Sequence, residues 1–413
     1  MNWSLLRLPT FRALWIGRLF SWTGSGIAPL ALAFAALDLG ADVVQLGLVV
    51  AARSVPNILL VLFGGPLTER LDRRMVAIVA SIVSAGSLLA ASAIIPAGVA
   101  TLPLLAALGA VNGVGAAFFV PATNALLHEV VDEADIGDAT VLTRVTMNIG
   151  LIVGTAAGGA VAGHIDADIA LLAGGVLFLG AVLGFSYIQR GIETARRSRS
   201  VRRDLADGLG FVFRTPWLLG AMILTFVAQA GFAGAIQVLG PLAADLTFGR
   251  TLWGFAGAMQ MVGMLVGAVV ANRVRSRIRL SRATLAGGGM ALPLVVLGLI
   301  LTVSPGLVDP LHWFFWLALA LVGASVGLEL FTVPLDARVQ ELVPRSYLAR
   351  VYTVVTLASL AGMPVGELAI GPLVNALGAG TTLFGWAALI VVVAVAVGLG
   401  RRVRRIDGFT TPG

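Results

Sequence analysis

The chain has neither cysteine nor lysine, so all 28 of its basic residues are arginine. Without cysteine it can form no disulfide, thiolate nucleophile or Cys-ligated metal site. Without lysine it has neither a Walker A lysine for ATP nor an amine for a Schiff base. Charged residues make up 12% of the chain, against roughly 25% in soluble domains. These absences argue against an ATP-driven machine and against a soluble protein.

Groups for catalysis or metal binding are also scarce. The three histidines, His128, His164 and His312, lie far apart in the sequence. We therefore expect no enzymatic activity, no metal and no cofactor.

Apolar residues dominate instead, at 58% of the chain with a mean hydropathy of +0.96. A run of about 20 apolar residues spans a bilayer as a helix, because backbone groups in lipid must bond internally. Twelve such runs are predicted: Ala13–Leu37, Val43–Leu67, Met75–Pro96, Leu102–Leu126, Ala139–Gly163, Ile169–Ile188, Trp217–Leu239, Leu252–Ala271, Ala283–Val303, Leu311–Leu335, Val351–Ala376 and Leu383–Gly400. The first run is too long for a signal-peptide core of about 7–15 residues, so we expect it to be retained.

Arginine is unevenly distributed among the segments that connect these runs. It is concentrated after the second, sixth, eighth and tenth runs and at the C-terminus, whereas the alternate segments hold only Arg250. The positive-inside rule then predicts a multi-pass protein of the plasma membrane with both termini in the cytoplasm. The net charge of +7 reflects this topology and an attraction to anionic lipids. It does not indicate nucleic-acid binding.

The two halves of the chain resemble each other. Gly150, Gly154 and Gly159 correspond to Gly362, Gly366 and Gly371, each 212 residues further on. The longest polar stretch lies between the halves. We predict an N-terminal six-helix bundle at 1–189, an Arg-rich cytoplasmic linker at 190–214 and a C-terminal six-helix bundle at 215–413.

The segment "GGPLTERLDRR" between the second and third runs carries a motif. It resembles the loop motif Gly-x-Leu-x-Asp-Arg-x-Gly-Arg-Arg of the major facilitator superfamily, and the matching residues are Gly65, Leu67, Arg70, Arg73 and Arg74. Glu69 replaces the usual aspartate, and Asp72 stands where glycine is usual. The phrases "FRALWIGRLFSWTGSGI", "FFVPATNALLHEVV" and "LDARVQELVPRSYLARVYT" are similar to the drug:proton antiporter branch with enterobactin exporters and macrolide-efflux proteins. The resemblance implies an all-α membrane fold of twelve helices in two pseudo-symmetric bundles.

The same resemblance implies a cytoplasmic latch between the halves. The latch would comprise Glu69, Arg70, Asp72, Arg73, Arg74 and Arg350. Glu69 would lie near the start of the eleventh helix, where Arg350 and the helix dipole both favour an anion. The alternative is that these charges only enforce topology.

"GLIVGTAAGG" in the fifth run is similar to the family's antiporter motif, Gly-x-x-x-Gly-Pro-x-x-Gly-Gly. The corresponding residues are Gly150, Gly154, Thr155, Gly158 and Gly159, with threonine replacing proline. Glycines at this spacing form a flat strip against which another helix can pack closely. The strip favours export through a tight contact between the halves, although helix packing alone would also explain it.

Charged residues inside the runs are candidates for function, because each is costly in lipid. Glu329 in the tenth run is a candidate proton carrier, or a structural carboxylate paired with a neighbour. Arg53 and Glu367 lie at matching depth in the second and eleventh runs and are predicted to form an ion pair between the halves, with Glu367 a second candidate for proton coupling. Alternatively, Arg53 faces a central cavity alone and contacts the substrate. Arg18 either lines that cavity or extends to the membrane surface.

The prediction that combines these features is a secondary exporter of small amphipathic molecules, drug-like or siderophore-like. It would work as a monomer by alternating access, exchanging its substrate for protons. A proton-coupled nutrient symporter and a membrane receptor or scaffold without transport activity are the alternatives.

Overall fold

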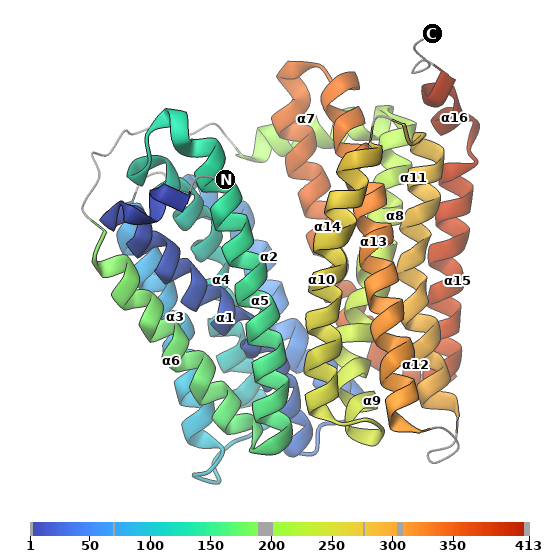
Figure 1. Cartoon of the computed structure of the whole chain (residues 1–413). Helices are drawn as coiled ribbons and strands as arrows, with labels where there is room; N and C mark the ends of the chain where they lie inside the picture. The colour runs from blue at the N-terminus through green and yellow to red at the C-terminus, as the bar shows by residue number, and fades with distance from the viewer. Residues whose placement is uncertain (1–2, 69–70, 189–200, 276, 304–308, 409–413) are drawn as a thin grey trace. The chain divides into compact units, whose positions relative to one another are not determined.

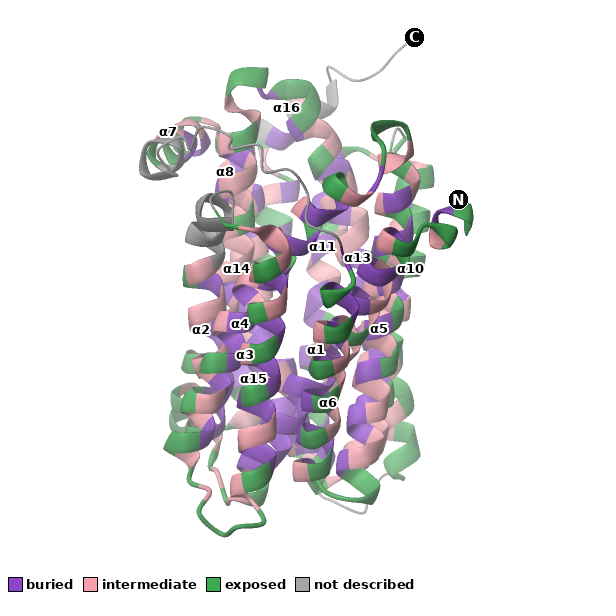
Figure 2. Ribbon diagram, turned by 90° about the vertical axis from the view of Figure 1, so that its left-hand side faces the viewer, coloured by how far each residue is buried: buried purple, intermediate pink, exposed green. Residues whose placement is uncertain are grey.

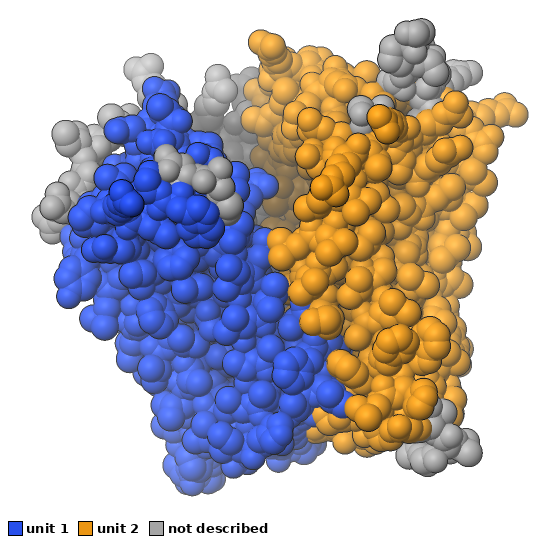
Figure 3. Space-filling model, in the orientation of Figure 1, with its two compact units in different colours: residues 1–199, 250–258 blue, residues 200–249, 259–413 orange. Residues whose placement is uncertain are grey.

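The computed structural model describes residues 3–68, 71–188, 201–275, 277–303 and 309–408. Within these ranges the chain is helical, and twelve helices are long and apolar enough to cross a membrane. The predicted all-α fold of twelve spanning helices is therefore confirmed. The chain divides into two compact units, unit 1 (residues 1–199 with 250–258) and unit 2 (residues 200–249 with 259–413), shown in Figure 3.

Unit 1 contains six spanning helices and the first nine residues of a seventh, α10. Its helices are α1 (Pro9–Asp38), α2 (Val43–Thr68), α3 (Arg73–Ile94), α4 (Leu102–Val130), α5 (Ile136–His164) and α6 (Ala167–Ser186), with 3-10 turns at Trp3–Arg7 and Glu133–Asp135. Helix α1 packs on α5 and α6, α3 packs on α4 and α6, and α2 packs on α4 (Figure 1).

Unit 2 contains the rest of α10 and the helices that follow the linker. They are α7 (Val201–Arg214), α8 (Pro216–Phe232), a π-helical segment (Ala233–Leu239), α9 (Gly240–Leu246), α10 (Arg250–Val274), α11 (Leu280–Gly287), a 3-10 turn (Gly288–Ala291), α12 (Leu292–Thr302), α13 (Pro310–Leu342), α14 (Arg345–Leu377), α15 (Ala379–Gly398) and α16 (Arg401–Gly408). Helix α14 packs on α8, α11 on α13, and α12 on α15.

Two predicted spans are not single regular α-helices. The ninth is split into α11 and α12 by a 3-10 turn. Three consecutive glycines at residues 287–289 disfavour the α-helix entropically, and Pro293 lacks the N–H that the next turn would need. The seventh continues beyond its predicted end to Leu246 through the π-helical segment. In the predicted linker, residues 201–214 form α7, and residues 190–200 lie outside the described part.

The helix surfaces suit a lipid environment. Large apolar side chains are exposed along the helices, among them Val79 and Ile82 on α3 and Val392 on α15. Figure 2 shows exposed residues along the length of the helices as well as in their connections. In water such a surface would drive aggregation, whereas acyl chains solvate it.

Candidate functional site

Arg53 belongs to a polar network inside unit 1. Its Nε on α2 donates to Oδ1 of Asn112 on α4 at 3.0 Å. The Asn112 amide donates in turn to Oγ of Ser87 on α3 at 3.3 Å. Gly113 brings α4 so close to α2 that a methyl group there would overlap the Arg53 carbonyl oxygen. The sequence singled out Arg53 but not Asn112, although an amide within an apolar helix is itself a signal of function.

Glu367 lies on α14 in unit 2 and is fully buried, with 0% of its surface exposed. The adjacent Gly366 packs directly on the backbone of Ala230 on α8, and Gly362 packs on the carbonyl of Phe226. These two glycines allow α14 to pack closely on α8 next to the Glu367 carboxylate. The predicted pair of Arg53 with Glu367 would join the two units, and it stays a prediction.

A charge swap tests that pair. We expect Arg53→Glu and Glu367→Arg each to abolish transport, because each leaves like charges where opposite ones are predicted. The double variant should recover a substantial part of the activity. Transport is measured at equal amounts of protein in the membrane. If the double variant is no more active than either single variant, the predicted ion pair is wrong.

Glu329 lies on α13 and is half-buried. It faces α10, since a methyl group on Gly267 would come within 3.0 Å of the Glu329 Cβ atom. The small residue leaves room for the carboxylate beside a neighbouring helix of unit 2. Its role as a proton carrier stays a prediction.

Arg18 lies within unit 1 and does not extend to an exposed position. Only 5% of its surface is exposed. Its Nη1 donates to Oδ1 of Asn124 on α4 at 3.1 Å. Of the two alternatives, the position of Arg18 favours an inward-facing side chain over extension to the membrane surface.

The glycine strip of α5 packs on α1 within unit 1. A methyl group on Gly150 would come within 2.7 Å of the Trp22 Cβ atom, and one on Gly154 would overlap the Thr23 carbonyl oxygen. A methyl group on Gly158 would come within 3.2 Å of the Ile27 Cα atom. The spacing of four residues thus lets the two helix backbones touch over two turns.

The neighbouring face of α5 packs on the start of α10. A methyl group on Gly159 would come within 2.5 Å of the Gly254 Cα atom. One on Gly257 would come within 2.7 Å of Cγ2 of Thr155. Thr155, which replaces the motif's proline, therefore fills a contact between helices. The motif residues serve two packing faces at once.

An ion pair that the sequence did not predict also holds α10. Arg250 donates to both carboxylate oxygens of Asp38 at the end of α1, at 3.0 and 2.5 Å. Its guanidinium lies 4.8 Å from the centre of the Phe34 ring. Thr251 Oγ1 lies 3.1 Å from Nδ1 of His164 at the end of α5. We call Asp38, Arg250, Thr251 and His164 the α10 clasp.

The clasp can be measured by a double-mutant cycle. We expect Arg250→Gln and Asp38→Asn each to lower the free energy of unfolding by about 1 kcal/mol, as bidentate, partly exposed pairs do. The double variant should cost little more than either change alone. Thermal unfolding of the purified protein gives the values, with Arg12→Gln as an exposed control on α1. Strictly additive effects would show that the pair contributes nothing.

The predicted latch falls partly outside the described residues, which exclude Glu69 and Arg70. Asp72 caps α3 by accepting from the Arg74 backbone N–H at 2.9 Å. Arg73 pairs with Glu129 at the end of α4 at 2.6 Å, and Arg74 donates to the Phe185 carbonyl on α6 at 3.1 Å. These contacts bind the charged segment to its own unit. The latch between Glu69 and Arg350 stays a prediction.

Arg350, at the start of α14, has a partner that the sequence did not indicate. It forms an ion pair with Asp207 of α7 at 3.2 Å. Gly208 allows this approach, since a methyl group there would come within 2.7 Å of the Arg350 carbonyl oxygen. The linker helix α7 is thereby attached to α14 within unit 2.

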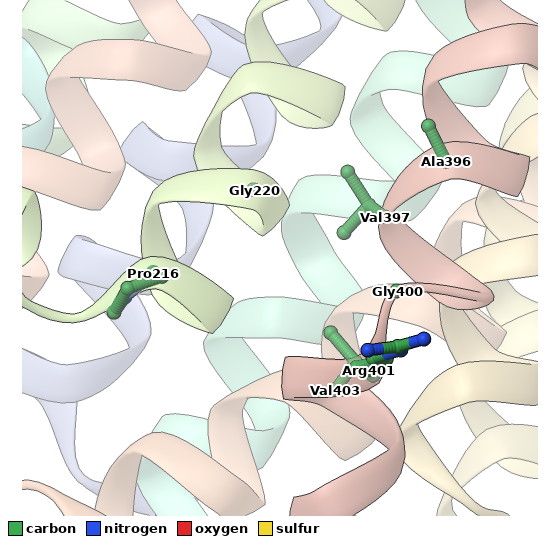
Figure 4. Close-up of a pocket in the computed structure, with 7 residues that line it drawn as sticks. All are labelled: Pro216, Gly220, Ala396, Val397, Gly400, Arg401 and Val403. Atoms are coloured by element: carbon green, nitrogen blue, oxygen red, sulfur yellow. The ribbon is translucent and has the colours of Figure 1, made fainter.

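A groove of about 360 Å³ lies in unit 2 where α8 begins and α15 ends (Figure 4). Its lining residues are Pro216, Gly220, Ala396, Val397, Gly400, Arg401 and Val403. The one charged side chain among them is Arg401, and neither Glu329 nor Glu367 is included. The groove is therefore separate from the ionisable groups discussed above.

Twelve helices are long and apolar enough to cross a membrane, and charged side chains such as Arg18 and Glu367 lie buried among them, as in a multi-pass membrane protein. Residues 14–367 match the sequence pattern of the Major Facilitator Superfamily. The chain belongs to that superfamily, which makes it a transport protein and not an enzyme.

Two relatives match over most of their length. The uncharacterized MFS-type transporter YfiS of Bacillus subtilis (strain 168) is 26% identical over 386 residues, covering 90% of this chain and 88% of the relative. The multidrug efflux pump Tap of Mycolicibacterium fortuitum is 26% identical over 406 residues, covering 94% and 95%. Of the two, Tap fits the drug-efflux branch, at modest identity.

Solved structures show the same fold. The nucleoside transporter NupG superposes with a TM-score of 0.76 at 15% identity, covering 94% of this chain and 98% of its own. The D-xylose-proton symporter has a TM-score of 0.67 at 14% identity, covering 95% and 96%. At these identities the likeness concerns the fold alone.

Proposed function

We propose that this protein is a secondary exporter of small amphipathic molecules, drug-like or siderophore-like, driven by proton antiport. The observation that carries the proposal is the full-length similarity to a multidrug efflux pump, at 26% identity over 94% of the chain. The glycine strip of α5 supports it, because its close packing on α1 and on the start of α10 suits a bundle that must not leak. The nucleoside and xylose transporters share only the fold, so they do not favour a nutrient symporter.

Proton coupling requires a group that gains and loses a proton during the cycle. Burial disfavours the charged form of a carboxylate, and Glu329 and Glu367 lie within spanning helices, half-buried and fully buried. In the proposed cycle one of them binds a proton in one orientation, and substrate release or binding accompanies its loss in the other. The protein would act as a monomer in the plasma membrane with both termini in the cytoplasm.

The test is growth protection of an efflux-deficient bacterial host that expresses the protein, against a panel of antibiotics and siderophores. We expect raised tolerance to at least one amphipathic compound, lost in Glu329→Gln or in Glu367→Gln. Glu341→Gln is the matched control, since Glu341 is exposed on α13 and pairs with Arg338. Unchanged tolerance across the panel, with the protein present in the membrane, would contradict export.

A further inference from the structure

Four polar atoms without a hydrogen-bond partner gather on one helix of unit 1. They are Nε1 of Trp15, Nε of Arg18, Oγ of Ser21 and Nε1 of Trp22, all on α1. No other buried side-chain polar atom among the described residues of unit 1 lacks a partner. At about 100° per residue the four side chains fall within an arc of roughly 120° on the helix. We call these four residues the α1 donor site.

The site is buried by the protein itself. Ser21 is fully buried and Arg18 is 95% buried, given its exposed share of 5%. Buried polar groups in proteins are nearly always hydrogen-bonded, and an exception calls for an explanation. Four exceptions on one helix face, one of them carrying a charge, are explained together if a ligand supplies the missing acceptors.

The chemistry of the four groups selects the ligand. An indole N–H and a guanidinium donate hydrogen bonds and cannot accept them, whereas a hydroxyl can do either. Arg18 uses Nη1 to donate to Asn124, and no carboxylate of the described residues forms an ion pair with it. The site therefore offers a positive charge and several donors, which match an oxyanion.

The surroundings of the donors are apolar. Trp22 packs edge-on against Phe119 of α4, with ring centres 5.6 Å apart. Trp15 and Trp22 are only partly buried and both lie against the hydrophobic core of the unit. Flat indole rings beside a cation suit a ligand in which an aromatic or aliphatic body adjoins the anionic group.

We propose that the α1 donor site binds the oxyanion of an amphipathic organic anion, with the apolar body of the ligand against the indoles of Trp15 and Trp22. This inference rests on the proposed function, since it names the substrate class of the proposed exporter. The site is specific for anions, because the positive charge of Arg18 repels a cation of the same shape.

Two dyes with the same ring system and opposite charge provide the test. Fluorescein is an anion at pH 7.5 and rhodamine 6G is a cation, and fluorescence anisotropy reports the binding of each to the purified protein in detergent micelles, with empty micelles as a blank. We expect saturable binding of fluorescein. Arg18→Gln should weaken it at least tenfold and Trp22→Phe, which keeps an aromatic ring but removes the N–H, several-fold. Arg12→Gln, an exposed position on α1, should leave it unchanged.

Arg18→Lys keeps the charge and serves if Arg18→Gln does not fold; it should bind fluorescein with intermediate affinity. Absence of saturable fluorescein binding, or equal affinity in the wild type and in the Arg18 and Trp22 variants, would overturn the inference. If cells export rhodamine 6G but the purified protein does not bind fluorescein, the proposed export function stands and the proposed anion site is wrong. Arg18-dependent fluorescein binding by a protein that exports nothing would retain the site and remove export.

Discussion

Replacement of Glu329 by glutamine is expected to abolish proton-driven efflux while leaving substrate exchange intact. Glutamine keeps the size and polarity of the side chain but cannot titrate. Net transport against a gradient needs a proton to be bound on one side and released on the other, whereas one-for-one exchange of substrate across a vesicle membrane needs no net proton movement. Gly267 of α10 lies opposite Glu329 of α13, and because it has no side chain it leaves space for the glutamate.

Two measurements on the same proteoliposomes separate the possibilities. Accumulation driven by an imposed pH difference should fall to the level of empty vesicles, and counterflow of labelled substrate should stay near the wild-type rate. Loss of both activities would give Glu329 a structural or substrate-binding role instead. Retention of both would leave Glu367, the second candidate, to be tested by the same pair of measurements.

The second large effect is on stability, and it has opposite signs at two glycines. We expect Gly154→Ala to lower the free energy of unfolding by about 1–3 kcal/mol, the cost of overpacking a close contact. The added methyl group would overlap the Thr23 carbonyl oxygen on α1, and backbone cannot yield as a flexible side chain does. Transport should fall together with stability, because the same strip packs α5 on α1.

Gly86→Ala is the matched control for that change. Gly86 lies within α3, is exposed, and has no atom within 4 Å of the position that a methyl group would take. Alanine there should raise the free energy of unfolding by about 0.5–1 kcal/mol through its higher helix propensity. Thermal unfolding in detergent measures both variants. Equal effects at the two positions would show that the strip is not a close packing contact.

The sequence predicted the spanning helices well because one physical signal dominates them. A run of about 20 apolar residues must be helical in lipid, and the twelve predicted runs correspond to the twelve spanning helices. The interruptions were harder to predict. The glycines at residues 287–289 weaken a helix without specifying whether it kinks, breaks or continues, and nothing local announces the π-helical segment Ala233–Leu239.

The charged side chains inside the spanning helices could also be identified from the sequence, because a charge in an apolar helix is costly and therefore conspicuous. Their partners could not. Asn112 and Asn124, which accept from Arg53 and Arg18, are neutral amides and carry a weaker signal. The pair of Asp38 with Arg250 joins residues 212 positions apart, and it depends on the packing of α10 against α1 and α5. Both residues lie at helix ends, where a charge is normally solvated and calls for no partner.

The anion site could not be predicted from the sequence. Its residues, apart from Arg18, are common in membrane helices, and a periodic pattern of Trp15, Ser21 and Trp22 is equally typical of packing. Burial without hydrogen-bond partners is a property of the folded chain, and only the structure reveals it.

Substrate-induced proton release from everted membrane vesicles distinguishes proton antiport from the other modes of transport. Respiration acidifies the vesicle lumen and quenches an acridine dye, and the compound exported in the growth test is then added outside. With proton antiport we expect immediate partial recovery of fluorescence, because protons leave the lumen in exchange for each substrate molecule that enters it. Vesicles without the protein should show no recovery. Unchanged or deeper quenching on addition of a compound that the protein demonstrably transports would contradict antiport.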